Sequence, residues 1–481
     1  MRRISKYTII AALVLMTVVS LGGCGKRGIW KLRGAVQQRR APVVITLWHS
    51  YNAVVKMQFD KLVQEFNDTV GMNEGIIIDA KGYGSSDELE EVLYASANRV
   101  IGAEPLPDIF SSYPDSAYRL DKIAPLVSLE EYFTGEELGK YRPEFLEEGM
   151  WDHSGVHKMV PVAKSTELLF LNKTDWERFS ADTGASMELL GTWEGLAKTA
   201  QMYYEWSGGQ PFLGMNYYND FAVITAAQLG ENVLSGSGKP VYSKETAGRV
   251  WDAYYIPHIM GWYESRVYNQ DGVKSGKMIA YIGSSAGAGF FPDEVIKDEN
   301  KSYPVECLCL PYPVFQNGEK YMTQRGANMG VFASDEVRER AACEFLKWFT
   351  QPEQNIRFAV STGYLPVEQE ALSSVPELLR NVDDTGNAAA ITSGINAYLE
   401  AGRQYAFYAK KAFDGSYELN KVFGESLEKK TAESLALMEK RILNGEKEDV
   451  VQKDLLEEDC FYRWYDSLIK EMAGMTDGEK N

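Results

Sequence analysis

The sequence contains little of the chemistry from which metal and redox sites are built. It has four histidines and five cysteines in 481 residues, and no two cysteines have the Cys-x-x-Cys spacing of a zinc or redox site. Cys307 and Cys309 would lie on one face of a strand, and buried free thiols are the ordinary state for such cysteines. We therefore expect no metal, no cofactor and no nucleophilic catalysis.

Positive charge and long apolar runs are also scarce. The chain has 50 Lys and Arg against 68 Asp and Glu, a formal net charge of -18. This balance argues against a nucleic-acid partner and against a broad basic membrane-binding face. Beyond residues 9–21, no apolar run is long enough to span a bilayer. The length allows roughly two to four domains, and the 45% hydrophobic content is enough for a large core.

The amino-terminal residues predict a processed and anchored chain. Arg2, Arg3 and Lys6 precede the apolar run, which ends in Leu21-Gly22-Gly23-Cys24. This arrangement predicts a signal peptide over 1–23, and its end resembles a bacterial lipobox, which implies cleavage before Cys24 and lipid on its thiol. A plain secretory signal and a transmembrane helix are the alternatives. Residues 24–41 carry six basic residues and no acid, and they are interpreted as a tether, solvated or lying against anionic headgroups.

The segment from 43 to 110 alternates between apolar strands and amphipathic helices. Strands are expected at 43–47, 76–78 and 107–110, with helices between them. The first helix has its apolar side chains at helical spacing, namely Val55, Phe59, Leu62, Val63 and Phe66. This order is typical of an α/β unit with a mostly parallel sheet, in which ligands bind beyond the carboxyl ends of the strands.

Residues 160–172 are the stretch on which the organisation depends. Pro161 suits a strand start or a crossover better than a strand centre, and the apolar run 168–171 predicts a short buried strand. We expect the chain to pass here from one lobe to another. Further strands are expected at 276–285, 307–311 and 326–332, and helices at 334–350 and 425–444. Thr350-Gln-Pro-Glu353 has the pattern of a capping box with proline in the first turn of the next helix.

Four separated stretches, in this order, resemble family 1 extracellular solute-binding proteins of bacterial ABC importers. They are Leu47-Trp48-His49-Ser50 with the helix end Glu65-Phe66-Asn67; residues 160–172; Gly276-Lys277-Met278-Ile279-Ala280; and residues 341–348 with Gly363-Tyr364-Leu365-Pro366. The resemblance implies a two-lobed α/β fold of the periplasmic-binding-protein type II, with hinge crossings and a helical carboxyl-terminal part. It implies a protein that closes on one solute and transforms nothing.

The resemblance also implies boundaries. The first lobe would hold 42–160 and 309–361, and the second lobe 161–308 and the hinge return with the C-terminal helices, 362–481. The expected partners are a carbohydrate, the permease subunits of an ABC importer and, through lipid on Cys24, the extracytoplasmic face of the cell membrane. A monomer is expected, and ATP would be used by a separate subunit.

Within the family the sequence is most similar to binders of sugars and of glycerol 3-phosphate. Ser165, Ser284 or Ser285, Gly326 and Tyr364 match ligand-contacting positions of that subgroup, and Tyr83 roughly matches a cleft tyrosine. Two departures stand out. Tyr218 and Phe221 occupy the places of two tryptophans of the glycerophosphate binders, and Ser111 occupies that of a glutamate. Because no basic residue matches a phosphate partner beyond the candidates Arg325 and Arg403, an uncharged saccharide is favoured over glycerol 3-phosphate or another polyol phosphate.

A sugar offers hydroxyl groups around its rim and apolar C–H faces, which suit polar and aromatic side chains together. The aromatic candidates at expected cleft loops are Trp48, Tyr83, Tyr113, Tyr218, Phe221 and Tyr364. The hydrogen-bonding candidates are His49, Asn52, Ser111, Ser165, Asn216, Asp220, Ser284, Ser285 and Asn328. Each of the aromatic residues would also suit ordinary core packing.

Two other classes of protein stay open on the residues alone. An anchored glycoside hydrolase would need two positioned carboxylates, and Asp108, Asp115 and Asp220 fall near expected cleft loops. A metal-binding receptor could use His153 and His157, whose spacing is helical, although Ser154-Gly155 between them favours a turn.

Overall fold

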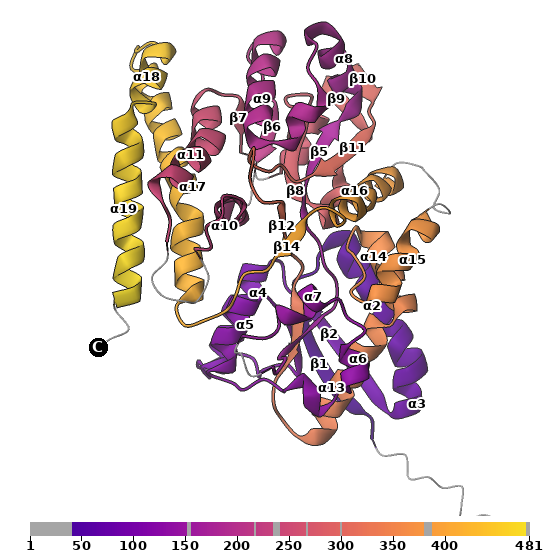
Figure 1. The fold of residues 1–481 in the computed structure, drawn as a ribbon. Coiled ribbons are helices and arrows are strands. Elements are labelled where there is room, and N and C mark those ends of the chain that lie inside the picture. Colours follow the sequence, from indigo (N-terminus) through magenta and orange to yellow (C-terminus); the bar gives the residue numbers. More distant parts are fainter. Residues whose placement is uncertain are drawn as a thin grey trace, which may run out of the picture.

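Two five-stranded sheets, each covered by its own helices, form two lobes joined by several crossing segments (Figure 1). The computed structural model describes residues 41–151, 155–215, 218–233, 241–265, 268–298, 301–379 and 387–477. Within these ranges, no helix combines the length and the apolar composition needed to cross a membrane. The predicted two-lobed α/β architecture with a helical carboxyl-terminal part is confirmed.

The first lobe is built on a sheet with the order β2-β1-β3-β13-β4. Its strands are β1 (Val43–His49), β2 (Ile76–Gly82), β3 (Ile109–Ser112), β13 (Asn328–Val331) and β4 (Met159–Pro161). β1 pairs in parallel with β2 and β3, while β13 runs antiparallel between β3 and β4. The expected strand–helix–strand order of 43–110 is therefore confirmed.

The helices of the first lobe cover this sheet and come from both ends of its sequence. They are α2 (Ala53–Phe66), α3 (Met72–Glu74), α4 (Ser86–Ala97), α5 (Pro114–Asp121), α6 (Gly135–Leu138), α7 (Pro143–Glu147), α13 (Glu336–Thr350), α14 (Pro352–Thr362) and α15 (Gln369–Leu379). The five apolar residues predicted for one face of α2 are all buried. Phe59 packs on Phe349 and Phe358, with ring centroids 5.4 and 6.3 Å apart, so α2, α13 and α14 share one core.

The second lobe is built on a sheet with the order β11-β5-β8-β6-β7. Its strands are β11 (Cys307–Pro311), β5 (Glu167–Asn172), β8 (Ala280–Ser284), β6 (Leu213–Met215) and β7 (Tyr263–Glu264). β5 is buried along its whole length and runs antiparallel to both of its neighbours. Cys307 and Cys309 do share one face of β11, with Sγ atoms 3.8 Å apart, and the four cysteines in the described ranges are unpaired.

Helices from the middle and the end of the chain cover the second sheet. They are α8 (Lys173–Thr183), α9 (Trp193–Ser207), α10 (Tyr218–Gln228), α11 (Lys244–Ile259), α12 (Asn269–Lys274), α16 (Asn387–Ala401), α17 (Ser416–Leu443), α18 (Glu448–Leu455) and α19 (Glu458–Asp477). α17 and α19 stand side by side at the outer edge of this lobe (Figure 1). Two smaller pairs complete the lobe, β9 (Glu294–Asp298) with β10 (Lys301–Pro304), and β12 (Tyr321–Thr323) with β14 (Ala406–Tyr408).

The passages between lobes differ in detail from the expected boundaries. The boundary at 309 falls inside β11, which pairs with β5 in the second sheet, so the chain returns to the first sheet only at 324–327. The boundary at 362 is also early, because Leu365, Val367 and Val375 belong to the core of the first lobe. The chain finally reaches the second lobe through α16, where Ser393 accepts a hydrogen bond from the backbone of Cys309.

The capping box expected at Thr350 is absent: Gln351 precedes α14 without a side-chain cap.

Candidate functional site

Three crossing segments lie side by side between the lobes. Ser165, on the first crossing, exchanges two backbone hydrogen bonds with Arg325 on the second, with N–O distances of 2.9 and 2.8 Å. Lys164 exchanges two with Leu365 on the third, at 3.2 and 2.7 Å. The first crossing is therefore held between the other two by strand-like pairing. This pairing fixes the direction in which each neighbouring side chain leaves the hinge.

A glycine allows this close approach. Gly326 has φ +90°, and a Cβ there would overlap the carbonyl oxygen of Ala163 on the first crossing. Its own carbonyl oxygen accepts a hydrogen bond from Lys164 Nζ at 3.1 Å. Lys164 also donates to Glu148, and the same carboxylate oxygen accepts from Asn328 Nδ2 at 2.9 Å. A buried ion pair thus ties two crossings to the segment after α7.

Four charged side chains gather where the crossings meet the second lobe. Arg325 pairs with Glu167 at the start of β5, and its Nε lies 3.2 Å from Asp220 near the start of α10. Lys410, which follows β14, lies 2.8 Å from the other oxygen of Asp220. Burial raises the pKa of Glu167, and Arg325 opposes that rise. Burial also works to raise the pKa of Asp220, but Lys410 and Arg325 together hold it below its ordinary value.

Aromatic side chains surround this charged cluster on the side of the first lobe. Tyr364, on the third crossing, stacks on Phe358 with ring centroids 5.9 Å apart and lies 6.2 Å from the ring of Tyr51. Burial raises the pKa of Tyr364, and the nearby Tyr113 at the start of α5 raises it further. The same Tyr113 acts on the pKa of Arg325, after larger effects from burial, Asp220 and Glu167. Tyrosines of the first lobe therefore lie close to the charged groups at the start of the second lobe, and this junction between the lobes is the candidate site.

The sequence from residue 61 to 381 matches the family model of the bacterial extracellular solute-binding proteins. The chain belongs to this family. It is therefore a solute-binding protein and not an enzyme. Comparison with curated proteins gives no match.

Solved structures of the same fold agree with the two-lobed architecture. The cyclic alpha-maltosyl-1,6-maltose binding protein of Arthrobacter globiformis has a TM-score of 0.63 and 18% identity, covering 89% of this chain and 100% of its own. UgpB of Mycobacterium tuberculosis, in complex with glycerophosphocholine, has a TM-score of 0.64 and 16% identity, covering 92% and 99%. Lmo0181 of Listeria monocytogenes, in complex with cycloalternan, has a TM-score of 0.63 and 13% identity, covering 90% and 99%. At these identities the likeness concerns the fold.

Several predicted site residues of this solute-binding protein meet at the hinge. Ser165 receives a hydrogen bond from Ser284 Oγ at 3.3 Å, and Ser285 pairs through its backbone and its side chain with Thr166. Gly326 and Tyr364 lie on the second and third crossings, as described above. The sequence therefore located one set of side chains that the fold brings together, and their contact with solute stays a prediction.

Other predicted residues are packed inside one lobe. Trp48 is 4% exposed and Tyr83 is 8% exposed, and they pack on each other with ring centroids 5.3 Å apart. His49 is fully buried against Tyr51 and Phe59. Phe221 packs between Trp193 and Tyr254 in the core of the second lobe. The burial of these rings favours core packing, the other role that the sequence allowed for them.

Ser111 and Tyr218 are the two remaining candidates. Ser111 is 2% exposed on β3, and its Oγ has no hydrogen-bond partner among the described residues. Tyr218 begins α10, but its side chain lies outside the described part of the chain.

Sequence reasoning missed Glu167 and Lys410. Glu167 carried a signal, since it is a carboxylate at the head of the apolar run 168–171, where a charge is expected only if it has a partner. Lys410 carried none, because its neighbour Asp220 is far away in the sequence; β14, which precedes Lys410, pairs with β12, and β12 contacts α10, which carries Asp220.

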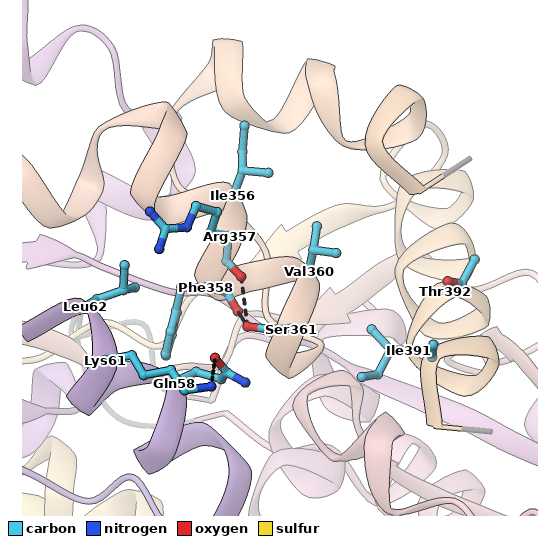
Figure 2. A pocket seen from close by; sticks show the side chains of 11 residues that line it. Gln58, Lys61, Leu62, Ile356, Arg357, Phe358, Val360, Ser361, Ile391 and Thr392 are labelled. Atoms are coloured by element: carbon cyan, nitrogen blue, oxygen red, sulfur yellow. Dashed lines mark hydrogen bonds between the residues drawn. The ribbon is translucent and has the colours of Figure 1, made fainter. Parts of the chain in front are cut away.

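A hollow of about 610 Å³ lies on another face of the hinge, between α2, α14 and α16. Figure 2 shows apolar side chains from all three helices around it, among them Leu62, Phe358 and Ile391. The polar groups at this hollow are engaged locally: Ser361 Oγ donates to the Arg357 carbonyl oxygen at 2.8 Å, and Arg357 forms a two-fold pair with Glu65. Because few polar groups are left to receive sugar hydroxyls here, the cleft at Arg325 is the better candidate site.

One serine has the spacing of a hydrolase nucleophile. The prediction of no nucleophilic catalysis overlooked Gly283-Ser-Ser-Ala-Gly287, which fits G-x-S-x-G. Ser285 is nevertheless buried, and its Oγ accepts a hydrogen bond from the Thr166 backbone at 3.3 Å. The histidines in the described ranges are engaged elsewhere: His157 pairs with Glu130, His258 bonds Tyr254 and Ser265, and His49 lies in the first core. His153 lies outside the described residues. The described ranges contain no cluster of three or more metal-ligating side chains.

Proposed function

We propose that the protein captures an uncharged saccharide between its lobes and delivers it to an ABC importer. The supporting observation is the charge balance of the cleft. Arg325 and Lys410 are each paired with carboxylates, so two cations and two anions neutralise one another. Glu167 Oε2 has no hydrogen-bond partner among the described residues. It is a ready acceptor for a hydroxyl group.

The tyrosines support the same class of solute. Tyr113 and Tyr364 lie near Arg325 on the side of the first lobe, and aromatic rings pack well on the C–H faces of sugars. Two of the structural relatives are named for, or hold, cyclic oligosaccharides. The length and linkage of the solute are set by cleft details outside these contacts.

A polyol phosphate is the second candidate, favoured by the likeness to UgpB with glycerophosphocholine. A phosphate requires cationic partners or several N–H donors. Arg325 was the candidate cation, and it is already engaged by Glu167 and Asp220. The balance of charge therefore favours the neutral solute.

The test is calorimetric titration of the purified protein with maltotriose, mannotriose, cycloalternan, glycerol 3-phosphate and glycerophosphocholine. We expect heat and a change in tryptophan fluorescence with at least one of the three saccharides and none with the two phosphates. Binding of a phosphate alone would reverse the assignment, and silence with all five would remove the ligand class.

Asp220→Asn tests the charge argument directly. It removes one anion and leaves Arg325 and Lys410 with a surplus positive charge. Because Asp220 holds both cations in place through charged hydrogen bonds, the site should be less well ordered, and saccharide binding should weaken by about 10-fold. Affinity for glycerol 3-phosphate should rise. Asp252→Asn on the exposed face of α11 is the matched control and should change neither.

We also propose that lipid on Cys24 holds the mature chain at the extracytoplasmic face of the membrane. Cys24 lies outside the described residues, and the lipobox-like sequence before it supports the proposal. A monomer tethered in this way would meet a permease at the same surface.

A further inference from the structure

The lobes also touch outside the crossing segments. There, α4 and α5 of the first lobe lie against the beginning of α17 and the residues just before it (Figure 1). α17 itself packs on α10 and α11, so it moves with the second lobe. Any opening of the cleft about the crossings must therefore separate α5 from α17.

Arg119 is at the centre of this contact. Its guanidinium carbon lies 4.4 Å from the ring centroid of Tyr94 in α4 and 3.9 Å from that of Tyr417 in α17. The cation thus lies between one ring from each lobe. Its nitrogen atoms also lie 3.4 Å from Glu90 of the first lobe and 3.7 Å from Glu418 of the second.

Polar contacts on either side of Arg119 also join the two lobes. Asp414 accepts a hydrogen bond from the Tyr118 hydroxyl at 3.0 Å and pairs with Lys122. Asn420 Nδ2 donates to Asp115 Oδ2 at 3.4 Å. Asp115 and Tyr118 are on α5, whereas Asp414 and Asn420 flank the first turn of α17. The contact therefore extends along α5 from Asp115 to Lys122, about two turns, and along the first turn of α17.

The strength of the contact suits reversible closure. The side chain of Arg119 is 31% exposed and that of Glu418 is 52% exposed, and ion pairs and cation–π contacts at such positions are individually weak. Their effects act together, because all of them form or break in the same motion. The crossing segments, in contrast, are joined by backbone hydrogen bonds.

We propose that Arg119 is a positioning residue that holds the lobes closed, through Tyr417 and Glu418, even before solute arrives. This proposal rests on the proposed function, since closure matters only to a protein that encloses its solute. Its consequence is a receptor whose closed form is populated in the free state, so that bound solute stabilises an arrangement that already exists.

The experiment measures lobe opening without any solute. Small-angle X-ray scattering of the free full-length protein should fit the closed arrangement. In Arg119→Ala the ratio of closed to open molecules should fall about tenfold, and the radius of gyration should increase. Amide hydrogen exchange in α5 and at 414–420 should quicken in the same variant. Arg119→Lys keeps the charge and loses the flat ring contact, so it should be intermediate.

Arg178→Ala is the matched control. Arg178 also pairs with a carboxylate, Asp175 at 2.9 Å, and also lies over a tyrosine, Tyr303 at 4.8 Å, but all three belong to the second lobe. It should lower the melting temperature about as much as Arg119→Ala and leave the scattering curve unchanged. If Arg119→Ala does not fold, Glu418→Lys is used in its place. Glu418 is exposed, so the substitution reverses the charge beside Arg119 without leaving a cavity between the helices.

Three results would overturn the proposal: a free wild type that is already open, a folded Arg119→Ala with the wild-type scattering curve, or equal opening in Arg178→Ala. Because no saccharide is used, these results are independent of the solute titrations. If the protein bound no sugar, the measurements of lobe opening would still be valid. If Arg119 did not hold the lobes closed, the assignment of a saccharide as the solute would still be valid.

Discussion

The buried ion pair between Lys164 and Glu148 makes a quantitative prediction about how the hinge is held together. Their side chains are only 1% and 5% exposed, and burial lowers the pKa of Lys164 while Glu148 opposes that effect. Removing one partner leaves the other charge buried without compensation. Breaking such a pair typically costs about 3–5 kcal/mol. We therefore expect Lys164→Met to lower the free energy of unfolding by that amount.

The double variant separates charge from packing. Lys164→Met with Glu148→Gln buries no charge, and the amide oxygen of the glutamine still accepts from Asn328 Nδ2. The remaining loss is the unpaired Gly326 carbonyl oxygen, worth about 1–3 kcal/mol. The double variant should thus be more stable than Lys164→Met alone by roughly 2 kcal/mol.

The assay is urea unfolding at pH 7, with the free energy extrapolated to water for the wild type, each single variant and the double variant. The coupling between the two changes should be favourable, because the second change relieves the charge that the first one exposed. A double variant whose loss equals the sum of the two single losses would refute the reasoning. It would show that the pair acts as two independent packing groups.

Three further predictions concern other parts of the chain. Burial lowers the pKa of His49 and of His258 from 6.5 to about 4, so the unfolded state binds protons first and stability falls as pH drops from about 6.5 to 4, by up to about 3 kcal/mol for each residue. Measuring the free energy of unfolding in urea at pH 7 and at pH 4.5 checks this prediction. His49→Gln should lose about half as much stability between the two pH values as the wild type. A free energy of unfolding that does not change between them would contradict the prediction. Gly326→Ala should destabilise the protein by more than about 2 kcal/mol, because the new Cβ would both strain the backbone and overlap Ala163. Gly184→Ala is the control: Gly184 has φ +71° with open space around it, so the substitution should cost only about 1 kcal/mol. Equal losses in the two variants would mean that the crossings are not closely packed. Cys24→Ala should release the protein from membranes into the soluble fraction, and continued membrane association would exclude the lipid anchor.

Local patterns predicted the elements well where one residue's environment depends on its near neighbours. The apolar spacing of Val55, Phe59, Leu62, Val63 and Phe66 gave the buried face of α2, because helical geometry alone brings these positions together. The run 168–171 gave the buried strand β5 of the second sheet, because a short continuous apolar run suits a strand that is covered on both faces. Pro161 was expected at a strand start or a crossover; it is the last residue of β4, directly before the first crossing, so the strand start was wrong and the crossover was right.

The site was harder to predict because it is made by distant segments. Arg325 was singled out only as a possible phosphate partner, and its actual partners, Glu167 and Asp220, lie 158 and 105 positions earlier in the numbering of the chain. Trp48 lies at the carboxyl end of β1 and Tyr83 follows β2, where cleft residues are expected, yet both pack in a core with apolar side chains of α4. No sequence spacing distinguishes a ring that a helix covers from a ring that a solute covers.

The two sets of contacts between the lobes have different physical characters, and this difference determines where the molecule can bend. At the crossings, backbone hydrogen bonds and a buried ion pair connect segments that belong to both lobes, so separating them would expose unpaired groups and a buried charge. At α5 and α17 the contacts are between side chains that water already reaches, and water can replace them at little cost. Opening therefore breaks the second set and leaves the first intact, which places the rotation axis along Ser165, Arg325 and Leu365. The charged cluster around Asp220 lies beside this axis, whereas Arg119 contacts Tyr417 and Glu418 across the two lobes, so opening separates Arg119 from these two side chains.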